Sequence, residues 1–582
     1  MAISAGRVTG EQELVEDVRL NDAWSLIQEF SSLVRESGSD AERQAVARIT
    51  SRLTSWGVPH TVYEPELLIS LPRHASLVLG DRTYAARTPS MAASTEGMTA
   101  PIVYLPTGFA RSVHDIFSGA VVDGDVIGKF VVTEGLPMPA KVSDLEARGA
   151  AGVVCISPGE RIHEGICTPI WGSPDLTSVG RQPRIPVASI SSSDGKDLVG
   201  RIGAHAVATM TTRLDTGWRT IPVTVAEIRG VVEPERFVLL HGHLDSWHVG
   251  IGDNATGDAT LLEVARLLSD HRDQLARSVR ICWWSGHSHG RYAGSTWFAD
   301  THANDVARNC ICHINCDSPG CRDATVFSDV YAMAEAEDFA RQVTFDVTGL
   351  TADCRYPARA GDISFNNLGV STFFMLSSTM PEDLRLQKGL HAVGGCGGNV
   401  EWHTEADTME IADRDNLLRD MRLYALATFR AANLPVHPLD FRGTVTQIEG
   451  ALRRHAVEVG KLADLSGTFE LIAYTRRDLD RLYDSARGVD SVSVARRVND
   501  AILAVGRALV PVLYSRAGRY RQDPALDIPL LPDFAAAVAA RDSFPEGVLR
   551  TELIRARNRL EGALLDAGEA AARVVIRPPS RP

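Results

Sequence analysis

The sequence predicts an α/β protein with a mixed, mostly parallel sheet and helices on both faces. The apolar run Phe237–Leu240 is followed by a glycine-rich loop and by the apolar-periodic segment Leu261–Leu268, which is the pattern of strand, loop and helix. Further apolar runs at Val279–Trp284 and Cys310–Gly320 also end in polar residues. This region lies between a segment rich in short strand-like runs and a segment of helical periodicity. Alternation of strands and helices is typical of parallel sheets.

The N-terminal part of the chain predicts helix followed by strand. Residues Leu20–Gly57 have apolar side chains at helical spacing, with Ser39-Asp40 as a helix start and Gly57 as a stop. The alternating segment after Gly57 predicts a strand. We assign residues 1–71 to the first part of a catalytic domain.

Two changes of pattern divide the rest of the chain. From residue 72 to residue 219, short β-type runs alternate with glycine and proline, which predicts an inserted β-rich domain. The strand–helix pattern resumes over 220–435 and completes the catalytic domain. Residues 436–582 are rich in Ala, Leu, Arg, Glu and Asp at helical spacing, which predicts a C-terminal helical domain.

Composition narrows the partners and the compartment. The net charge of −13 argues against nucleic acid as a partner. No apolar run reaches the 18 or so residues of a membrane span, and the first residues lack the apolar core of a secretory signal. The nine cysteines are an odd number and are expected to be free thiols. We therefore expect a cytoplasmic protein that acts on a small molecule.

Polar residues recur where the expected strands end. His243 and Asp245 follow the first strand, Asp253 begins the helix after it, Asp317 follows a later strand, and His403 lies in a further cluster. Ligands and metals bind at this edge of open α/β sheets. Imidazole and carboxylate groups together suit zinc and similar divalent ions.

These motifs resemble the co-catalytic zinc aminopeptidase-like family that includes glutamate carboxypeptidase and the transferrin receptor. His243–Trp247 resembles its first metal motif, Asp253-Asn254 its bridging aspartate, and Gly361–Val370 its later Asp-x-x-Phe loop. The resemblance implies a zinc-exopeptidase fold, a protease-associated inserted domain and a homodimer formed through the C-terminal helices. It also implies one metal ion bound by His243, Asp253 and Asp317, and a second bound by Asp253, His403 and one further ligand.

The sequence departs from the family at its Glu-Glu pair, in which the first glutamate is the general base and the second a metal ligand. Here the turn reads His287-Ser288-His289. Counting forward from Trp284 places His287 at the base position and Ser288 at the ligand position. Counting backward from Gly294-Ser295 places Ser288 at the base position and His289 at the ligand position. We favour the forward count, with His287 and Asp245 as catalytic residues and His289 as the replacement ligand.

Together these motifs predict a metal-dependent hydrolase. We expect metal-activated water to cleave an amide bond, peptide-like or acyl-amide, of a small substrate that is not an ordinary peptide. The cofactor is one or two divalent ions, zinc first, with iron, manganese or nickel as alternatives. Tyr292, just past the site turn, is a candidate for substrate contact. Two alternatives stay open: lyase, C–C hydrolytic or oxygen-dependent metal chemistry, and a catalytically silent binding protein of the transferrin-receptor type.

Overall fold

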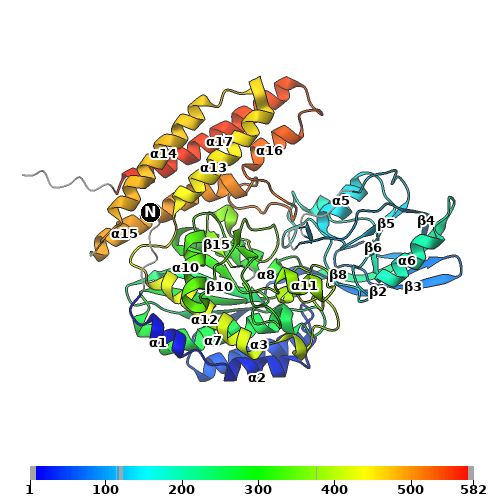
Figure 1. Ribbon diagram of the computed structural model, residues 1–582, viewed down its shortest axis with the longest axis horizontal. Helices are drawn as coiled ribbons and strands as arrows, with labels where there is room; N and C mark the ends of the chain where they lie inside the picture. The colour runs from blue at the N-terminus through cyan, green and yellow to red at the C-terminus, as the bar shows by residue number, and fades with distance from the viewer. Residues whose placement is uncertain (1–7, 113–114, 117–121, 375–376, 490, 575–582) are drawn as a thin grey trace, which may run out of the picture.

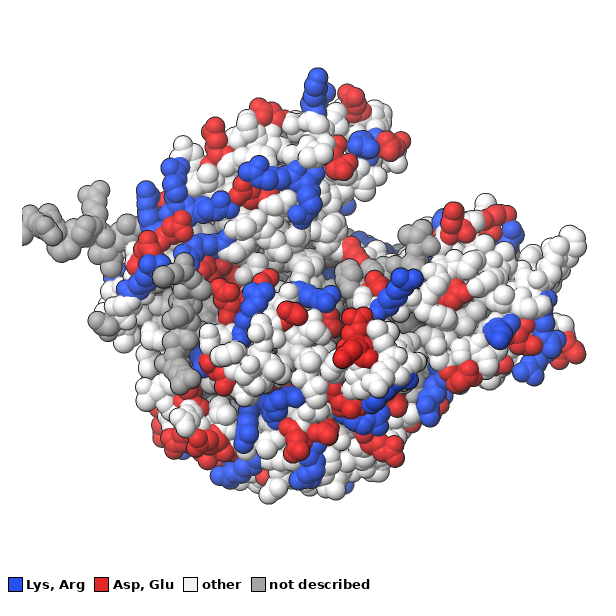
Figure 2. Space-filling view, viewed as in Figure 1, with Lys and Arg blue, Asp and Glu red and all other residues white. Residues whose placement is uncertain are grey.

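The computed structural model describes residues 8–112, 115–116, 122–374, 377–489 and 491–574. An α/β body lies at the centre, a strand-rich lobe extends to one side of it, and a group of long helices packs above it (Figure 1). The face shown in Figure 2 is hollowed between the long helices and the strand-rich lobe, and acidic and basic side chains are interspersed over it.

A six-stranded sheet forms the centre of the α/β body, in the order β1-β9-β11-β10-β12-β15. Strand β10 pairs in parallel with β11 and β12, and β12 pairs in parallel with β15, whereas β9 is antiparallel to both β1 and β11. This arrangement confirms the mixed, mostly parallel sheet. The strands are β1 (His60–Tyr63), β9 (Val223–Ile228), β10 (Glu233–His243), β11 (Arg277–Trp284), β12 (Cys310–Asn315) and β15 (Ser371–Phe373).

The helices of this body cover both faces of the sheet. Along β10, Val238 and Leu240 pack into one buried cluster with the apolar side of α7, while Phe237 and Leu239 pack into another with α8 and α9. Because both faces are covered, the strand is apolar at successive positions. The helices are α1 (Glu11–Glu16), α2 (Asn21–Phe30), α3 (Asp40–Ser55), α7 (Thr256–Asp270), α8 (Ala293–Thr301), α9 (Ala303–Asn309), α10 (Glu337–Thr348), α11 (Glu382–Gln387) and α12 (Arg414–Asn433).

The N-terminal helical segment consists of separate helices, and one of them starts where the sequence predicted a helix start, at Ser39-Asp40. Helix α2 ends at Phe30 and α3 begins at Asp40, where the Ser39 side chain accepts a hydrogen bond from the Glu42 N–H, as the sequence suggested. Residues 31–39 form a loop between the two helices. This loop reaches the strand ends of the sheet and brings Arg35 and Ser37 there.

The inserted lobe is built on a second sheet in the order β3-β2-β8-β4-β5-β6-β7. Its two longest strands, β2 and β8, pair antiparallel from Glu66 opposite Thr220 to Leu79 opposite Ala208 and carry the chain into and out of the lobe. The predicted boundary at residue 72 falls inside β2. The elements are β2 (Glu66–Leu79), β3 (Arg82–Ala86), β4 (Thr95–Tyr104), β5 (Phe130–Glu134), β6 (Gly152–Ile156), β7 (Val187–Ile190), β8 (Val207–Thr220), α5 (Pro139–Ala147) and α6 (Ser192–Arg201).

The C-terminal helices pack on one another and on the α/β body. Helix α17 lies against α14 and α15. Arg507 of α15 donates to the carbonyl groups of Ala307 and Gly369, so one side of this domain is covered by its own chain. The homodimer stays a prediction. The helices are α13 (Phe441–Val459), α14 (Ser466–Ser485), α15 (Val492–Tyr514), α16 (Pro532–Ala539) and α17 (Glu546–Ala572).

Short elements complete the chain. Among the described residues, no helix has both the length and the hydropathy needed to cross a bilayer. The short elements are β13 (Val330–Tyr331), β14 (Cys354–Arg355), η1 (Val179–Arg181), η2 (Ile251–Ala255), η3 (Arg272–Gln274), η4 (Asn366–Leu368), η5 (Cys396–Gly398), η6 (Met409–Ile411) and η7 (Gly460–Leu462).

Candidate metal centre

The ends of the parallel strands bring the predicted site residues together. Strand β10 ends at His243, and β12 ends two residues before Asp317. The turn η2, immediately before α7, carries Asp253, and His403 lies in the loop after η5. Because the carboxyl ends of parallel strands lie at the same edge of a sheet, residues far apart in the chain meet there.

Asp253 lies between two histidines. Its Oδ1 is 2.8 Å from Nε2 of His243, and its Oδ2 is 3.0 Å from Nε2 of His403. Nε2 of His243 is also 3.8 Å from Oδ2 of Asp317. Each of the two carboxylate oxygens of Asp253 thus faces a different histidine, which is the arrangement of a bridging ligand.

The tautomers of these histidines follow from their other hydrogen bonds. Nδ1 of His243 is 2.8 Å from the carbonyl oxygen of Asp245, and Nδ1 of His403 is 3.0 Å from that of Glu164. A carbonyl oxygen only accepts, so each Nδ1 carries a proton, and in the neutral form of each ring Nε2 would present a lone pair to Asp253. A lone pair facing a carboxylate oxygen at this distance requires a cation between them, either a proton or a metal ion.

Burial and charge also favour a cation at this place. Burial lowers the pKa of His243, but the close contact with Asp253 and the charges of Asp253 and Asp317 raise it well above its usual value. Burial and the charge of Asp253 raise the pKa of Asp317 to about 6. Nε2 of His243 and Oδ1 of Asp253 are buried without a well-formed hydrogen bond among the described residues. This donor set fits zinc or a similar divalent ion.

His287 joins this group. The ligand atoms of His243, His287 and Asp317 lie within 4.8 Å of one another. The rings of His243 and His287 stack with centroids 3.8 Å apart and planes 14° from parallel. Nδ1 of His287 is 2.8 Å from Oδ2 of Asp362, which leaves Nε2 as the available nitrogen. Asp362 lies in the loop Gly361–Val370, and the sequence predicted no role for this aspartate.

His289 lies elsewhere, which corrects its assignment as a metal ligand. Its Nδ1 is 2.9 Å from Oγ of Ser37 and 3.6 Å from Oδ2 of Asp245, and its ring packs against Trp247. The reason is the conformation of the turn. The N–H groups of His287 and Ser288 both donate to the carboxylate of Asp245, at 3.0 and 2.9 Å, and the turn held in this way sends the two histidine side chains to different places.

Asp245 therefore fixes the turn that carries His287. Its carboxylate also accepts a hydrogen bond of 2.7 Å from Oγ of Ser37. Burial raises the pKa of Asp245, but the hydrogen bond with His289 and the charge of His243 hold it well below its usual value, so the group is a carboxylate. The contact with His243 comes from the carbonyl of Asp245 and not from its side chain.

Two further contacts were not anticipated from the sequence. Arg35 is fully buried and donates to the carbonyl groups of Leu244, Val249 and Gly250, which fixes the loop between His243 and Asp253. Glu164 of the inserted lobe binds His403 twice, since its N–H donates to the His403 carbonyl at 2.8 Å and its own carbonyl accepts from Nδ1 of His403. No local sequence motif identifies Arg35 or Glu164, because each contacts residues that lie far from it in the sequence.

A pocket of about 70 Å³ lies over these residues. The α/β body contributes Asp253, His287, Asp317 and His403 to it, and the inserted lobe contributes Leu136, Met138 and Ile166 among others. Tyr292 also lines the pocket, with its ring edge against His287 and its hydroxyl accepting the Gly361 N–H at 2.8 Å. A role for Tyr292 in substrate contact stays a prediction.

Asp407 supports the loop that carries Asp253. Its two carboxylate oxygens accept the N–H groups of Gly252 and Asp253 at 2.6 and 3.0 Å. We expect Asp407→Ala to weaken metal binding by about 10–100-fold, since such supporting contacts orient the ligand. Competition with a chromogenic chelator measures the affinity. Glu405→Ala, at an exposed position two residues before Asp407, is the matched control. Equal affinity in the two variants would show that Asp253 keeps its position without Asp407.

Comparison with known proteins agrees with this geometry. Residues 224–428, which include each of the residues around Asp253, match the model of peptidase family M28. This region of the chain is therefore similar to peptidase family M28. The match confirms the resemblance described above, while the exchange of the Glu-Glu pair stays an interpretation of the sequence. The match, together with the named relatives, supports a metal-dependent hydrolase.

Relatives of known sequence cover different shares of the chain. A probable glutamate carboxypeptidase of Zea mays, VP8, is 24% identical over 81% of this chain and 76% of its own length. Carboxypeptidase Q of Mus musculus is 24% identical over 43% of this chain, and carboxypeptidase Q of Homo sapiens is 35% identical over 19% of it. The chain spans about half the length of the mouse protein.

Solved structures share the fold. An aminopeptidase from Aneurinibacillus sp. strain AM-1 superposes with a TM-score of 0.54 at 19% identity, covering 72% of this chain and 96% of that one. The zinc aminopeptidase BSAP of Bacillus subtilis gives a TM-score of 0.52 at 20% identity, covering 71% and 95%. These likenesses confirm the fold class predicted from the sequence.

Proposed function

We propose that this protein hydrolyses an amide bond, peptide-like or acyl-amide, of a small substrate at a metal centre formed by His243, Asp253 and Asp317. One observation carries the proposal: each oxygen of Asp253 lies within 3.0 Å of Nε2 of a different histidine. A divalent ion at this place would lower the pKa of a water molecule and polarise the carbonyl group of the substrate.

His287 is the proton acceptor in this proposal. Its Nδ1 proton is held by Asp362, so the lone pair of Nε2 is available on the side of the pocket. Burial raises the pKa of Asp362, but His287 and the Ser295 hydroxyl bring it below its usual value, so Asp362 is a carboxylate. A carboxylate hydrogen-bonded to imidazole fixes the tautomer and stabilises the positive charge that the ring gains with a proton.

The second metal position has a smaller set of ligands. Asp253 and His403 supply two groups, and Ser288 stands where the family resemblance places a carboxylate. A neutral hydroxyl binds a hard divalent ion more weakly than a carboxylate does. We therefore propose one tightly bound ion per chain, with zinc ahead of iron, manganese and nickel.

The substrate proposed here is not an ordinary peptide. The acidic pair that the family resemblance assigns to peptide hydrolysis is replaced, and residues of the inserted lobe line the pocket over the metal centre. All nine cysteines are unpaired, which supports the proposed cytoplasmic location.

Metal analysis of protein purified without chelator, followed by an activity screen, tests this proposal. We expect about one equivalent of zinc per chain and cleavage of dipeptides, acyl amino acids or simple amides that a chelator abolishes and added zinc restores. Iron as the bound metal, with turnover that depends on oxygen, would replace hydrolysis by redox chemistry. A metal-free protein without turnover would contradict both.

A further inference from the structure

A second, larger cavity lies beside the pocket over the metal centre. It has a volume of about 280 Å³ and lies between the inserted lobe and the loop that carries His403. Leu136, Met138 and Trp402 line both the cavity and the pocket, so the two spaces are neighbours. A substrate bound at the metal centre can therefore extend into this cavity.

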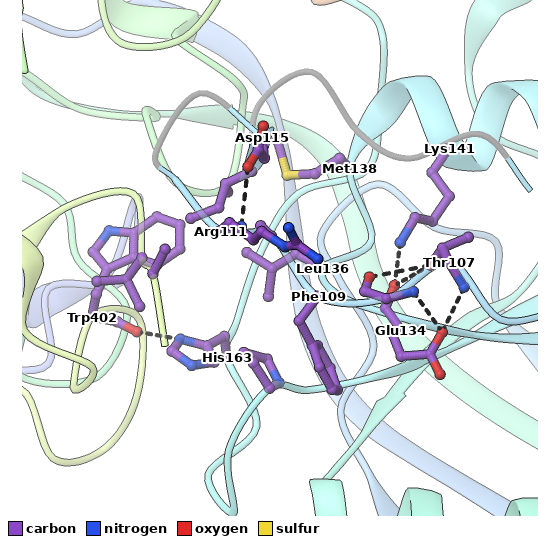
Figure 3. Close-up of a pocket in the computed structure, with 17 residues that line it drawn as sticks. Thr107, Phe109, Arg111, Asp115, Glu134, Leu136, Met138, Lys141, His163 and Trp402 are labelled. Atoms are coloured by element: carbon purple, nitrogen blue, oxygen red, sulfur yellow. Dashed lines mark hydrogen bonds between the residues drawn. The ribbon is translucent and has the colours of Figure 1, made fainter. Parts of the chain in front are cut away.

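On the side of the cavity nearest the metal centre, the wall has few groups that could bind a charged part of a ligand. Nδ1 of His163 donates to the carbonyl of Trp402 at 2.6 Å, and its Nε2 accepts from Nε2 of His391 at 3.2 Å. The hydrogen-bonding groups of His163 are thus used within the protein. Leu136, Met138 and Phe109 lie between this side and the opposite end, as Figure 3 shows. This stretch of the cavity suits an apolar segment.

Lys141 lies at the opposite end of the cavity (Figure 3). Its side chain is only 5% exposed, and its Nζ donates to the backbone carbonyl of Glu134 at 2.5 Å. No carboxylate of the described residues lies within 4.0 Å of this nitrogen in an ion pair, unlike most of the basic side chains in the same lobe. A buried ammonium group is costly without an anionic partner.

The carboxylate of Glu134, whose backbone carbonyl binds Lys141, is directed elsewhere. The side chain of Glu134 accepts hydrogen bonds from the Tyr104 hydroxyl and from the N–H groups of Thr107 and Gly108. An ammonium group has three N–H donors, and the Glu134 carbonyl uses one of them. Two donors of Lys141 therefore remain for a group in the cavity.

We propose that this cavity binds the non-reacting part of the substrate, an apolar segment that ends in a carboxylate held by Lys141. The reacting amide would lie at the metal centre, the apolar segment would cross Leu136, Met138 and Phe109, and the carboxylate would accept hydrogen bonds from Lys141 Nζ. The substrate class is thus an amide whose acyl chain carries a terminal carboxylate. The cavity part stands on its own geometry; the link to cleavage rests on the proposed function.

Binding of phenylbutyrate and its neutral counterpart phenylbutyramide to the full chain tests the cavity by calorimetry. We expect phenylbutyrate to bind ~10–100-fold more tightly, the range for a charge-assisted hydrogen bond. Lys141→Met should remove this preference. Lys141→Gln, which keeps a donor for the Glu134 carbonyl, should also remove it and covers a failure of the first variant to fold.

Two further variants identify the source of any preference. Lys129→Met removes a lysine of the same lobe that pairs with Asp125, and the preference should survive in it. His243→Ala disrupts the metal centre, and the preference should survive there too. A preference that is lost in His243→Ala and kept in Lys141→Met would place the carboxylate on the metal and overturn the proposal. Equal binding of the two probes would overturn it as well.

Hydrolysis of anilides connects the cavity with the reaction. Anilides of straight-chain dicarboxylic acids should be cleaved with a higher kcat/KM than anilides of monocarboxylic acids of the same length, by the same ~10–100-fold. Lys141→Met should reduce only the first series. If phenylbutyrate bound in a way that depends on Lys141 but no amide were cleaved, the role of the cavity would stand and the proposed function would be contradicted. Equal losses in both series would contradict a role of Lys141 in selecting the carboxylate.

Discussion

Asp253→Asn is expected to lower kcat/KM by at least ~1,000-fold and to reduce the metal content of the purified protein. The substitution keeps the shape of the side chain but replaces one oxygen and removes the charge. Each oxygen of Asp253 lies 2.8 or 3.0 Å from a nitrogen of a different histidine, so the change affects both sides of the site at once. Loss of the metal contribution, several kcal/mol of transition-state stabilisation, accounts for the expected size. Elemental analysis and steady-state kinetics measure the two effects.

The control for this experiment lies on the helix that follows Asp253. Asp270, at the far end of α7, is 59% exposed in its side chain and pairs only with Arg266 among the described residues. Asp270→Asn should leave both metal content and turnover unchanged. If Asp253→Asn kept its metal and its activity, the bridging role of Asp253 would be wrong and the metal centre would have to lie elsewhere.

His287→Ala is expected to lower kcat by ~10²–10⁴-fold while about one equivalent of metal stays bound. The range is that of a general base removed from a reaction. His243, Asp253 and Asp317 remain in this variant, and these three residues are proposed to hold the ion. Asp362→Asn should cause a smaller loss of kcat, because it removes the group that orients the imidazole ring and not the ring itself.

Metal content separates the two possible roles of His287. Its ligand atom lies close enough to those of His243 and Asp317 to bind the same ion. If His287→Ala lost its metal together with its activity, His287 would be a ligand, and the proton acceptor would have to be sought among other groups. His74→Ala, at an exposed position on β2, provides a variant in which both quantities should be unchanged.

The sequence predicted the residues that lie at strand ends. His243 ends a strand, Asp317 follows a strand by two residues, and Asp253 lies in the turn before the next helix, so that an apolar run followed by a polar cluster marks these positions. The parallel sheet then places them at one edge. The alternation of strands and helices also predicted the mixed, mostly parallel sheet, while the domain boundaries stay a prediction.

The arrangement of the turn after β11 could not be predicted. The choice between His287 and His289 depends on how Asp245 and Ser37 hold the turn, and Ser37 comes from a loop more than 200 residues away. The sequence did not indicate this loop, because the residues on both sides of it have helical periodicity. Lys141 was missed for a similar reason, since its burial depends on packing within the inserted lobe and not on its neighbours in sequence.

The contacts between Glu164 and His403 limit how this architecture can be recombined. A chimera that exchanges the inserted lobe for that of a relative, but keeps the native loop around His403, would replace the carbonyl that sets the protonation of that histidine. Successful grafts should therefore transfer both segments together. During evolution the two segments are expected to have changed as a pair, even though about 240 positions of sequence separate them.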